Sequence, residues 1–343
     1  MSGWSLKLAS ALIAILVGSD RMKNVGIPLK LISLLADGEF HSGAKLSALF
    51  GMSFAEINKY IQTVREWGVE VLTITVPKTG YRLHEPLQLL DETAIWARLP
   101  YGRLVVISVI NSTNQYLIDR IGILEPGDVC TAEYQTQGRG RRGRKWLSPF
   151  GKNIYLSIYW RFEQGQSATS GLSIMVGIVI AEMLQRLGFE GVRVKWPNDI
   201  YLNNSKLAGI LLEITGQVGN VIHFVIGVGM NLNMPGSASD MIDQDWINLQ
   251  EVGITIDRNA LVAELINTLR QTLQQFERDG FAPFVNRWQS LDNFYNCPVK
   301  LIIGNQEIRG ISSGINTNGA LLLEQDGEYH AYSDGDISLR LAS

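Results

Sequence analysis

The sequence predicts a multi-domain α/β protein in three parts: a winged helix-turn-helix at residues 22–86, a mixed α/β domain at 87–292 and a small β-barrel at 293–343. Three observations predict this organisation. Helical spacing followed by a strand–turn–strand pattern fills the first part, strand-like runs alternate with helical segments in the second, and helix signals are missing from the third. A length of 343 residues allows two or three domains of ordinary size.

The composition is that of a globular protein in a reducing compartment. Hydrophobic residues make up 46% and charged residues 18%, which excludes disordered and collagen-like chains. Cys130 and Cys297 cannot build a disulfide framework, and neither stands at metal-ligand spacing from the four histidines. We therefore expect a cytoplasmic protein without a metal site of its own. The net charge of −3 gives no sign of nucleic-acid binding.

Two apolar stretches raise the question of a membrane. The stretch 8–17 resembles the core of a signal peptide, but one preceding lysine and a poor cleavage site favour an extension, residues 1–21, upstream of a fold that begins at Met22. The stretch 171–181 is shorter than the ~20 apolar residues of a membrane span and is followed by Glu182. We expect a buried helix there and no membrane partner.

The N-terminal part has the pattern of helices followed by a hairpin. A helix is predicted around residues 29–35, a short one at 42–50, and a third after the cap Ser53. Alternation at 69–75 predicts a strand, which turns back at 77–80. Two helices joined by a short glycine-containing turn and followed by a hairpin are typical of a winged helix-turn-helix.

The other two parts differ in their helix content. The clearest helix of the central part runs from the cap Asp257 to Gly280. Apolar runs predict central strands at 104–109, 129–134, 153–160, 192–196, 207–214 and 221–230. After residue 293, short runs separated by turns such as Asn318-Gly319 predict an antiparallel barrel similar to an SH3 fold.

The most unusual segment is 135–146, whose residues 138–145 comprise five basic residues and three glycines. Like-charge repulsion and glycine entropy oppose order in the empty loop, whereas a polyanion would neutralise the charge and approach the backbone N–H groups. The segment matches G-x-G-x-x-G, but Pro149 and Gly151 stand where that fingerprint requires a helix, so we reject a Rossmann site. A solvated basic loop, or a non-specific nucleic-acid patch, is the alternative.

Two lysines and a carboxylate stand close to this loop in the sequence. Residues 195–199 (Lys-Trp-Pro-Asn-Asp) close a strand, and a hairpin at 203–205 would bring Lys195 and Lys206 onto neighbouring strands. Such a set suits phosphoryl or nucleotidyl chemistry, because lysines neutralise phosphate charge and a carboxylate can hold magnesium or move a proton. Taken alone, Lys206 is also typical of a solvated strand, and Asn198-Asp199 of a turn.

Polar residues follow two other apolar strands. Residues 112–115 (Ser-Thr-Asn-Gln) fit either a helix capping box or a site that hydrogen-bonds a small polar ligand. Residues 227–231 combine glycines, which permit close ligand approach, with Asn231. Neither cysteine has a histidine partner, so any chemistry is expected to avoid a covalent protein intermediate.

Together, Ser112-Thr113-Asn114, the loop 138–144, the motif 195–199 and Lys206-Leu207-Ala208-Gly209 resemble the biotin–protein ligases. With the helix-turn-helix in front, the resemblance narrows to the bacterial bifunctional ligases that also repress the biotin operon, and it spans residues 22–341. It implies a class II synthetase-like central domain that takes biotin, ATP and Mg²⁺. The implied product, biotinyl-5′-AMP, is passed to a lysine of the biotin carboxyl carrier protein of acetyl-CoA carboxylase.

The resemblance also implies roles for individual residues. It assigns catalysis to Arg141, Lys206 and Asp199, the last orienting the attacking lysine. The implied biotin-binding residues are Ser112, Thr113, Asn114, Gln135, Arg139, Gly140, Arg141 and Lys206. The implied nucleotide-side residues are Arg142, Arg144, Lys195, Asn198 and Asn231. The implied DNA-binding residues, which act in an adenylate-bound homodimer on operator DNA, are Ser53, Phe54, Asn58, Lys59 and Lys78.

The recognition helix departs from the family pattern. Phe54 stands where relatives typically have arginine and Glu56 where they have a small residue, and both changes lower phosphate affinity. The wing at 76–81 is also longer than usual, and residues 22–86 carry seven Lys or Arg against six Asp or Glu. A ligase with weakened DNA binding, a ligand-sensing repressor without ligase activity, and a lipoate-type ligase are therefore the alternatives.

Overall fold

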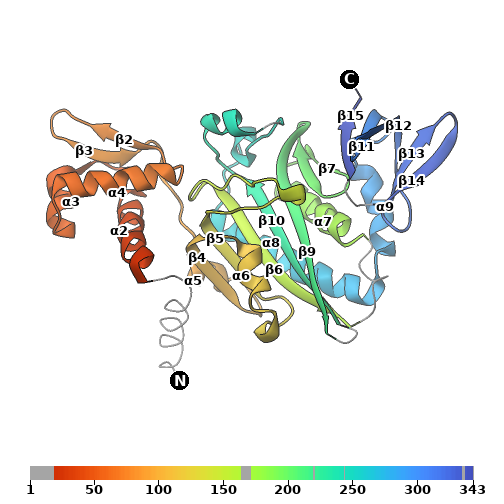
Figure 1. The fold of residues 1–343 in the computed structure, drawn as a ribbon, viewed down its shortest axis with the longest axis horizontal. Coiled ribbons are helices and arrows are strands. Elements are labelled where there is room, and N and C mark those ends of the chain that lie inside the picture. The colour runs from red at the N-terminus through yellow and green to blue at the C-terminus, as the bar shows by residue number, and fades with distance from the viewer. Residues whose placement is uncertain (1–18, 164–170, 219–220, 243, 334–336, 343) are drawn as a thin grey trace. The chain divides into compact units, whose positions relative to one another are not determined.

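The computed structural model describes residues 19–163, 171–218, 221–242, 244–333 and 337–342. The chain forms two compact units, one of residues 1–89 with 149–151 and one of 90–148 with 152–343 (Figure 1). Most of the expected extension at 1–21 lies outside the described residues, although its last three positions belong to the first described helix. The three predicted domain ranges stay predictions.

The first unit packs helices against a small sheet. Its helices are α2 (Ser19–Leu35), α3 (Gly43–Phe50) and α4 (Phe54–Glu66), and its strands are β1 (His41–Ser42), β2 (Val71–Ile74) and β3 (Gly80–Leu83). The sheet order is β1-β3-β2, and all pairs are antiparallel. Leu35, Leu46, Ile57, Ile61 and Val64 are fully buried between the elements. The predicted helices and hairpin are thus present.

Local capping sets the helix ends of this unit. The Ser42 side chain accepts from the Lys45 amide, and Gly51 ends α3 with φ 62°, a left-handed conformation that favours glycine. Ser53 caps α4 as predicted, and a capping box pairs it with Glu56. Glu56 is therefore engaged in holding the start of α4.

The second unit is built on a seven-stranded sheet of order β4-β5-β6-β10-β9-β8-β7. Its strands are β4 (Leu104–Ile110), β5 (Val129–Gln135), β6 (Asn153–Phe162), β7 (Val192–Lys195), β8 (Asp199–Leu202), β9 (Ser205–Val218) and β10 (Val221–Asn231). β4 and β5 are parallel and the other pairs are antiparallel. The six predicted central strands are confirmed, and β8 is an additional one.

Within the described part of this unit, five α-helices accompany the sheet. They are α5 (Glu92–Trp96), α6 (Thr113–Ile118), α7 (Leu172–Arg186), α8 (Arg258–Asp279) and α9 (Ala282–Leu291). α8 has the predicted caps Asp257 and Gly280. The stretch around 171–181 is confirmed as part of a buried helix, α7. Within the described ranges, no helix is both long and apolar enough to cross a membrane.

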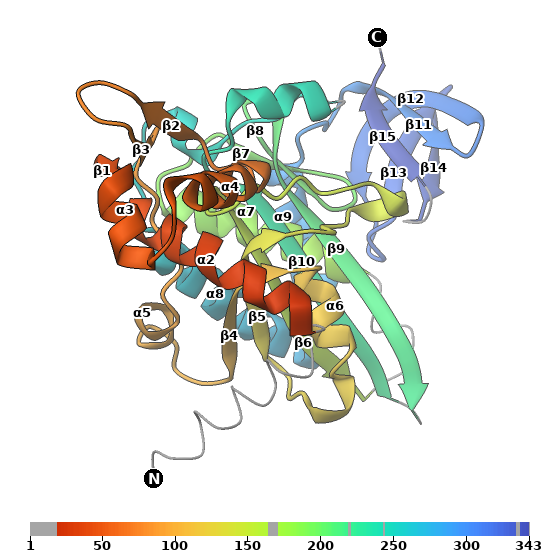
Figure 2. The ribbon, with the colours of Figure 1, turned by 60° about the vertical axis from the view of Figure 1, so that its left-hand side comes forward.

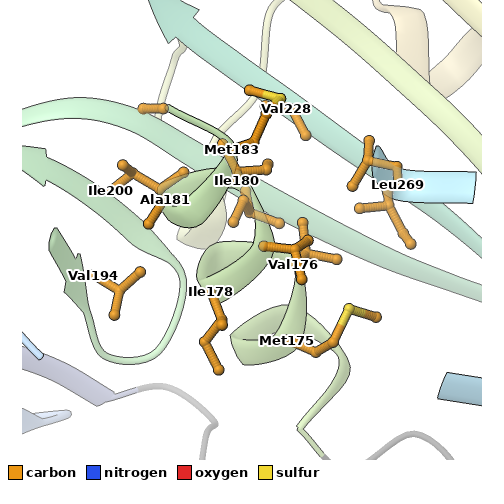
Figure 3. Packing of buried hydrophobic residues seen from close by; sticks show 14 of the residues in the cluster. Met175, Val176, Ile178, Ile180, Ala181, Met183, Val194, Ile200, Val228 and Leu269 are labelled. Carbon is orange, nitrogen blue, oxygen red and sulfur yellow. The ribbon is translucent and has the colours of Figure 1, made fainter. Parts of the chain in front are cut away.

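The two faces of the sheet have different chemistry. α7 and α8 cover one face, where Val194, Ile200, Val228 and Leu269 pack around α7 (Figure 3). α6 lies on the other face, against β5, β6 and β10 (Figure 2). Because side chains alternate along a strand, most apolar residues of β6, β9 and β10 point to α7 and α8. The glycine and most polar residues of these strands point to the face of α6, where Val225 also packs, beside Leu117.

The C-terminal sheet contains β11 (Pro298–Ile303), β12 (Gln306–Ile315), β13 (Leu321–Gln325), β14 (Glu328–Tyr332) and β15 (Ile337–Leu341). The expected closed barrel is wrong. The order is β14-β13-β12-β11-β15, and β14 and β15 are edges that do not pair with each other in the described chain. β14 is exposed along nearly its whole length, so it offers no buried row of side chains with which to close a barrel.

Candidate active site

A pocket of the second unit lies on the sheet face that carries α6. It brings together the end of β5, the basic loop, the β7–β8 turn, and parts of β9, β10 and β15. Its lining includes Ser112, Thr113, Asn114, Gln135, Arg139, Gly140, Arg141, Arg142, Arg144, Lys145, Trp146, Lys195, Trp196, Asn198, Asp199, Lys206, Gly209, Gly227, Gly229, Gln244, Ser338 and Leu339. Seven of the described lining residues are cationic, and one, Asp199, is an acid.

The first turn of α6 forms a neutral polar corner of this pocket. Ser112 caps α6 by accepting from the Gln115 amide, and the Thr113 amide donates to Gln135 Oε1 at 2.9 Å. Ser112, Thr113 and Asn114 are each at most 4% exposed. The cap and the ligand site that the sequence left as alternatives are therefore compatible, because the capping residue also lines the pocket.

The basic loop is a short hairpin rather than an irregular segment. Gly140 donates to the Arg144 carbonyl at 2.8 Å, and Trp146 donates to the Gly138 carbonyl at 2.9 Å. Arg142 turns the tip with φ 59°, a left-handed conformation. No α-helix follows the glycines in this described stretch, as the rejection of a Rossmann site requires.

Trp146 was not predicted as a site residue. Its ring packs over Gly209 of β9 and Gly229 of β10, which face each other across the two strands. A Cβ on Gly229 would lie 2.4 Å from the ring, and a Cβ on Gly209 would lie 3.1 Å from it. The two glycines therefore leave the space that the indole fills, which we call the glycine seat. A tryptophan in the basic segment, together with a glycine in each of two later strands, was the sequence pattern that could have indicated Trp146.

Asp199 lies between the two lysines of the pocket. Its Oδ1 is 2.7 Å from Lys206 Nζ, and its Oδ2 is 3.9 Å from Lys195 Nζ. The expectation that Lys195 and Lys206 occupy neighbouring strands is wrong, because β8 inserts between β7 and β9. The reason is that the chain reverses at Trp196–Asn198, so that Asp199 begins a new strand opposite Lys195.

Burial lowers the pKa of Lys195 below its usual value, although Asp199 acts in the opposite direction. The positive charges of Lys206, Arg340 and Arg144 add to the lowering. The Lys195 ammonium donates to the Tyr201 hydroxyl at 3.1 Å, and its side chain is 12% exposed. An anion in the pocket would therefore favour the charged form of this lysine.

The C-terminal sheet completes the pocket. Ile337, Ser338 and Leu339 of β15 line it, and the indole nitrogen of the buried Trp196 donates to the Gly319 carbonyl at 3.0 Å. On the other side of the β7–β8 turn, Asn198 Oδ1 accepts from Arg141 at 3.2 Å, which fixes the tip of the basic hairpin.

All the predicted biotin-side residues line the pocket, as do Asp199 and four of the five nucleotide-side residues. Asn231 does not, because its side chain is 3% exposed and donates to the carbonyls of Lys206 and Ile247 at 3.4 Å each. It supports the backbone of Lys206 instead. Sequence reasoning also missed Ser157 and Glu213, which hydrogen-bond to the side chain of Asn114.

The five predicted DNA-binding residues lie in the first unit. Phe54 is 39% exposed and stacks on Tyr81 of β3 at 5.8 Å between ring centroids, and the Tyr81 hydroxyl donates to Asn58 Oδ1. Ser53 is bonded to Glu56. Lys59 and Lys78 are exposed.

Outside this pocket, the reactive groups of the described residues do not form a second site. Cys130 is buried among apolar residues, which raises the pKa of its thiol, and both cysteines are free. Among the described residues, no three His, Cys, Asp or Glu side chains gather in a way that could hold a metal ion.

Comparison with known proteins identifies the family. Residues 106–231 match the Biotin/lipoate A/B protein ligase family, and residues 296–340 match the Biotin protein ligase C terminal domain. The bifunctional ligase/repressor BirA of Salmonella typhimurium is 60% identical over 94% of this chain and 100% of its own length. The chain belongs to the bifunctional biotin ligase/repressor family. BirA of Escherichia coli K12 is 58% identical over 94% of this chain and 99% of its own length.

A solved structure shares the fold of the ligase part. The biotin protein ligase of Aquifex aeolicus in complex with biotin and ATP has a TM-score of 0.60 and 27% identity, over 70% of this chain and 99% of that one. The chain therefore has the biotin protein ligase fold, with a central α/β domain and a C-terminal β-sheet domain.

Proposed function

We propose that the protein is an ATP-dependent biotin–protein ligase that makes biotinyl-5′-AMP and transfers biotin to a lysine of the biotin carboxyl carrier protein of acetyl-CoA carboxylase. One observation carries the proposal. A single pocket joins a neutral polar corner, suited to a cyclic urea, to a cluster of arginines and lysines suited to a triphosphate. Family membership supports the same reaction.

In the first step, the biotin carboxylate attacks the α-phosphorus of ATP, and the bond from that phosphorus to the bridging oxygen breaks to release pyrophosphate. Both reactants are anions, so the barrier contains their mutual repulsion. Lys206 and Arg141 offset it by placing positive charge where the carboxylate and α-phosphate meet. Arg142, Arg144 and Lys195 bind the remaining phosphates. Asn198 accepts a hydrogen bond from Arg141 and so holds its side chain in place.

Magnesium is proposed to arrive with the triphosphate and to supply further neutralisation of its charge. A divalent cation of this kind usually takes one or two carboxylates and substrate oxygens. Asp199, the acid of the described pocket lining, is held by Lys206 and is the candidate protein contact.

In the second step, the ε-amine of the carrier lysine attacks the carbonyl carbon of the mixed anhydride, and AMP leaves. The amine must lose a proton, which the phosphate of the departing AMP accepts, and we assign Asp199 to orient the amine. The adenylate must also be hidden from water until the carrier arrives. We assign this to the basic hairpin, with Arg139, Gly140 and Arg141 covering the intermediate.

The decisive experiment gives purified protein biotin, α-labelled ATP and Mg²⁺ and looks for biotinyl adenylate, then adds a carrier domain and looks for its biotinylation. Failure to form the adenylate would refute the ligase and leave a ligand-sensing repressor. A competition between biotin and lipoate tests the remaining alternative, since a lipoate-type ligase would prefer a ligand without a ureido ring.

We further propose that the first unit is a winged helix-turn-helix, with α4 as the recognition helix and the β2–β3 hairpin as the wing, and that an adenylate-bound homodimer binds a two-fold-symmetric operator. The exposed Lys59 and Lys78 support phosphate contacts. Gel shifts with and without biotin and ATP test it, and binding that ignores the ligand would contradict it. A cytoplasmic location stays a prediction.

A further inference from the structure

Glu213 does not line the pocket, yet it holds two residues that do. Its carboxylate accepts from Asn114 Nδ2 at 2.7 Å and from Arg139 Nη2 at 3.0 and 3.1 Å. It stands on β9, on the same sheet face as the pocket glycines, and its side chain is 27% exposed. One carboxylate therefore joins the polar corner to the base of the basic hairpin.

The first consequence concerns the orientation of the Asn114 amide. An asparagine side chain has one end that only donates and one that only accepts. Glu213 and the Leu211 carbonyl, 3.4 Å away, are both acceptors, so Nδ2 faces them. Oδ1 consequently faces the hydroxyl of Ser157.

The orientation propagates through the hydroxyls of two buried residues, Ser157 and Thr113. Ser157 Oγ lies within hydrogen-bonding distance of Asn114 Oδ1 and 2.7 Å from Thr113 Oγ1. A hydroxyl carries one hydrogen, and Asn114 Oδ1 can only accept, so Ser157 donates to it. The Thr113 hydroxyl then donates its one hydrogen to Ser157, so the contact of Thr113 Oγ1 with Gln135 Oε1, 3.1 Å away, carries no hydrogen, and the Thr113 lone pairs are left for the pocket.

We propose that Glu213 is a positioning residue that fixes the polarity of this chain, so that the polar corner accepts the N–H groups of a cyclic urea. The chain runs from Thr113 through Ser157 and Asn114 to Glu213, and Gln135 Oε1, which accepts from the Thr113 amide at 2.9 Å, provides a second acceptor. This rests on the proposed function, since biotin is the ligand whose ureido ring offers those N–H groups.

The same carboxylate tethers the hairpin. Arg139 is held on one side by Glu213 and on the other by Gln115 Oε1, at 3.1 Å. Its backbone pairs with Lys145 across the base of the hairpin. Without the Glu213 charge, the clustered cations of the loop repel each other with less compensation, and the hairpin opens more readily over a bound adenylate.

Two substitutions separate the two roles. Glu213→Gln keeps an oxygen for Asn114 Nδ2 but removes the charge beside Arg139. We expect it to bind biotin with wild-type affinity in calorimetry without ATP, and to release biotinyl adenylate faster. Glu213→Ala removes both the oxygen that accepts from Asn114 and the charge beside Arg139, and we expect the Kd of this variant for biotin to rise by about tenfold to about a hundredfold.

A ligand probe tests polarity directly. Biotin methylated on one ureido nitrogen cannot donate there, so the wild-type protein should prefer biotin strongly, and Glu213→Ala should lose much of that preference. Glu190→Gln, an exposed carboxylate of the same unit, is the matched control. If thermal unfolding shows that the alanine variant does not fold, Glu213→Met, of similar length but without an acceptor, takes its place.

The outcomes are distinct. If the wild-type protein makes no biotinyl adenylate, the proposed function fails. If it does, and Glu213→Ala matches it in biotin affinity, in preference over the methylated analogue and in adenylate release, this inference alone is overturned.

Discussion

Lys206 Nζ lies 2.7 Å from Asp199 Oδ1, and the two residues belong to adjacent strands, β9 and β8. The ammonium is thereby held in one position on the pocket wall with 15% of its side chain exposed. A fixed cation stabilises a developing negative charge without reorganising at the moment of reaction. Replacing either residue of this pair should therefore change the proposed reaction.

Removing the lysine should therefore slow the chemistry rather than only weaken binding. Lys206→Ala is expected to lower the rate of adenylate formation by about a hundredfold or more, as for the loss of one charge-stabilising donor, and Arg141→Ala should also lower it. Pyrophosphate release in a single turnover measures the rate. Lys300→Ala, in the C-terminal sheet, is the control, and wild-type rates in the two site variants would show that the site is misplaced.

The pH dependence of the reaction should respond to Asp199. Its negative charge raises the pKa of Lys195, which burial holds below the usual value. Asp199→Asn removes that support, so the Lys195 ammonium is lost at lower pH and the alkaline limb of the activity profile moves toward neutrality. Lys195→Arg, whose charge does not titrate, should move the limb the other way. An unchanged limb in both variants would contradict a role for this ammonium.

The glycine seat of Trp146 should be sensitive to a single methyl group. Gly229→Ala places a Cβ 2.4 Å from the indole and must displace it. We expect a higher KM for ATP, because Trp146 lies at the base of the basic hairpin, and a smaller effect from Gly209→Ala. Gly122→Ala, with no atom within 4 Å of the added Cβ, is the control. Equal KM values in all three variants would argue against the seat.

Stability should depend on pH through His223. Burial, with a contribution from the charge of Arg161, lowers the pKa of this histidine, whose Nδ1 lies 2.8 Å from the Tyr159 hydroxyl. The unfolded chain therefore binds this proton more readily, so stability is full above the unfolded pKa of about 6.5 and is lost as pH falls below it. His223→Gln should lose less stability in urea unfolding between about pH 7.5 and pH 5. If the wild-type protein and His223→Gln lose equal stability over this pH range, His223 does not cause the pH dependence.

The proposed recognition helix, α4, should gain DNA affinity from one arginine. Phe54 stacks on Tyr81 at the start of α4, where it adds no charge. Phe54→Arg should strengthen operator binding and steepen its salt dependence by about one phosphate contact. Phe54→Leu controls for the lost stacking. A salt slope identical to that of the wild-type protein would show that this position does not reach the DNA.

Local patterns in the sequence were enough to predict most helices and strands. The caps Ser53, Asp257 and Gly280 lie where the structure has them, since capping depends on residues close in the chain. Barrel closure was not predictable in this way. It depends on whether β14 and β15 meet, and turn signals between neighbouring strands carry no information about that pair.

Site residues in contiguous motifs could be predicted from the sequence. The prediction failed for residues whose roles depend on contacts with distant parts of the chain. Six of the eight residues of the loop 138–145 line the pocket, together with Ser112–Asn114 and Lys206. Asn231 does not, because its side chain faces two backbone carbonyls that the sequence does not place beside it. Glu213 carried one signal, an acid that interrupts an apolar strand, but its partners are 99 and 74 residues away in the chain.

The hydrogen bond from the Trp196 indole to the Gly319 carbonyl limits which segments can be exchanged between homologues to make chimeric proteins. The indole belongs to the motif that carries Lys195, while its acceptor sits in a turn of the C-terminal sheet, and a Cβ on that glycine would collide with Ile174. If only the last fifty residues were exchanged, the β7–β8 turn of one homologue would have to pack on the C-terminal turn of another. Grafts that move both segments together should keep activity, and those that split them should lose it.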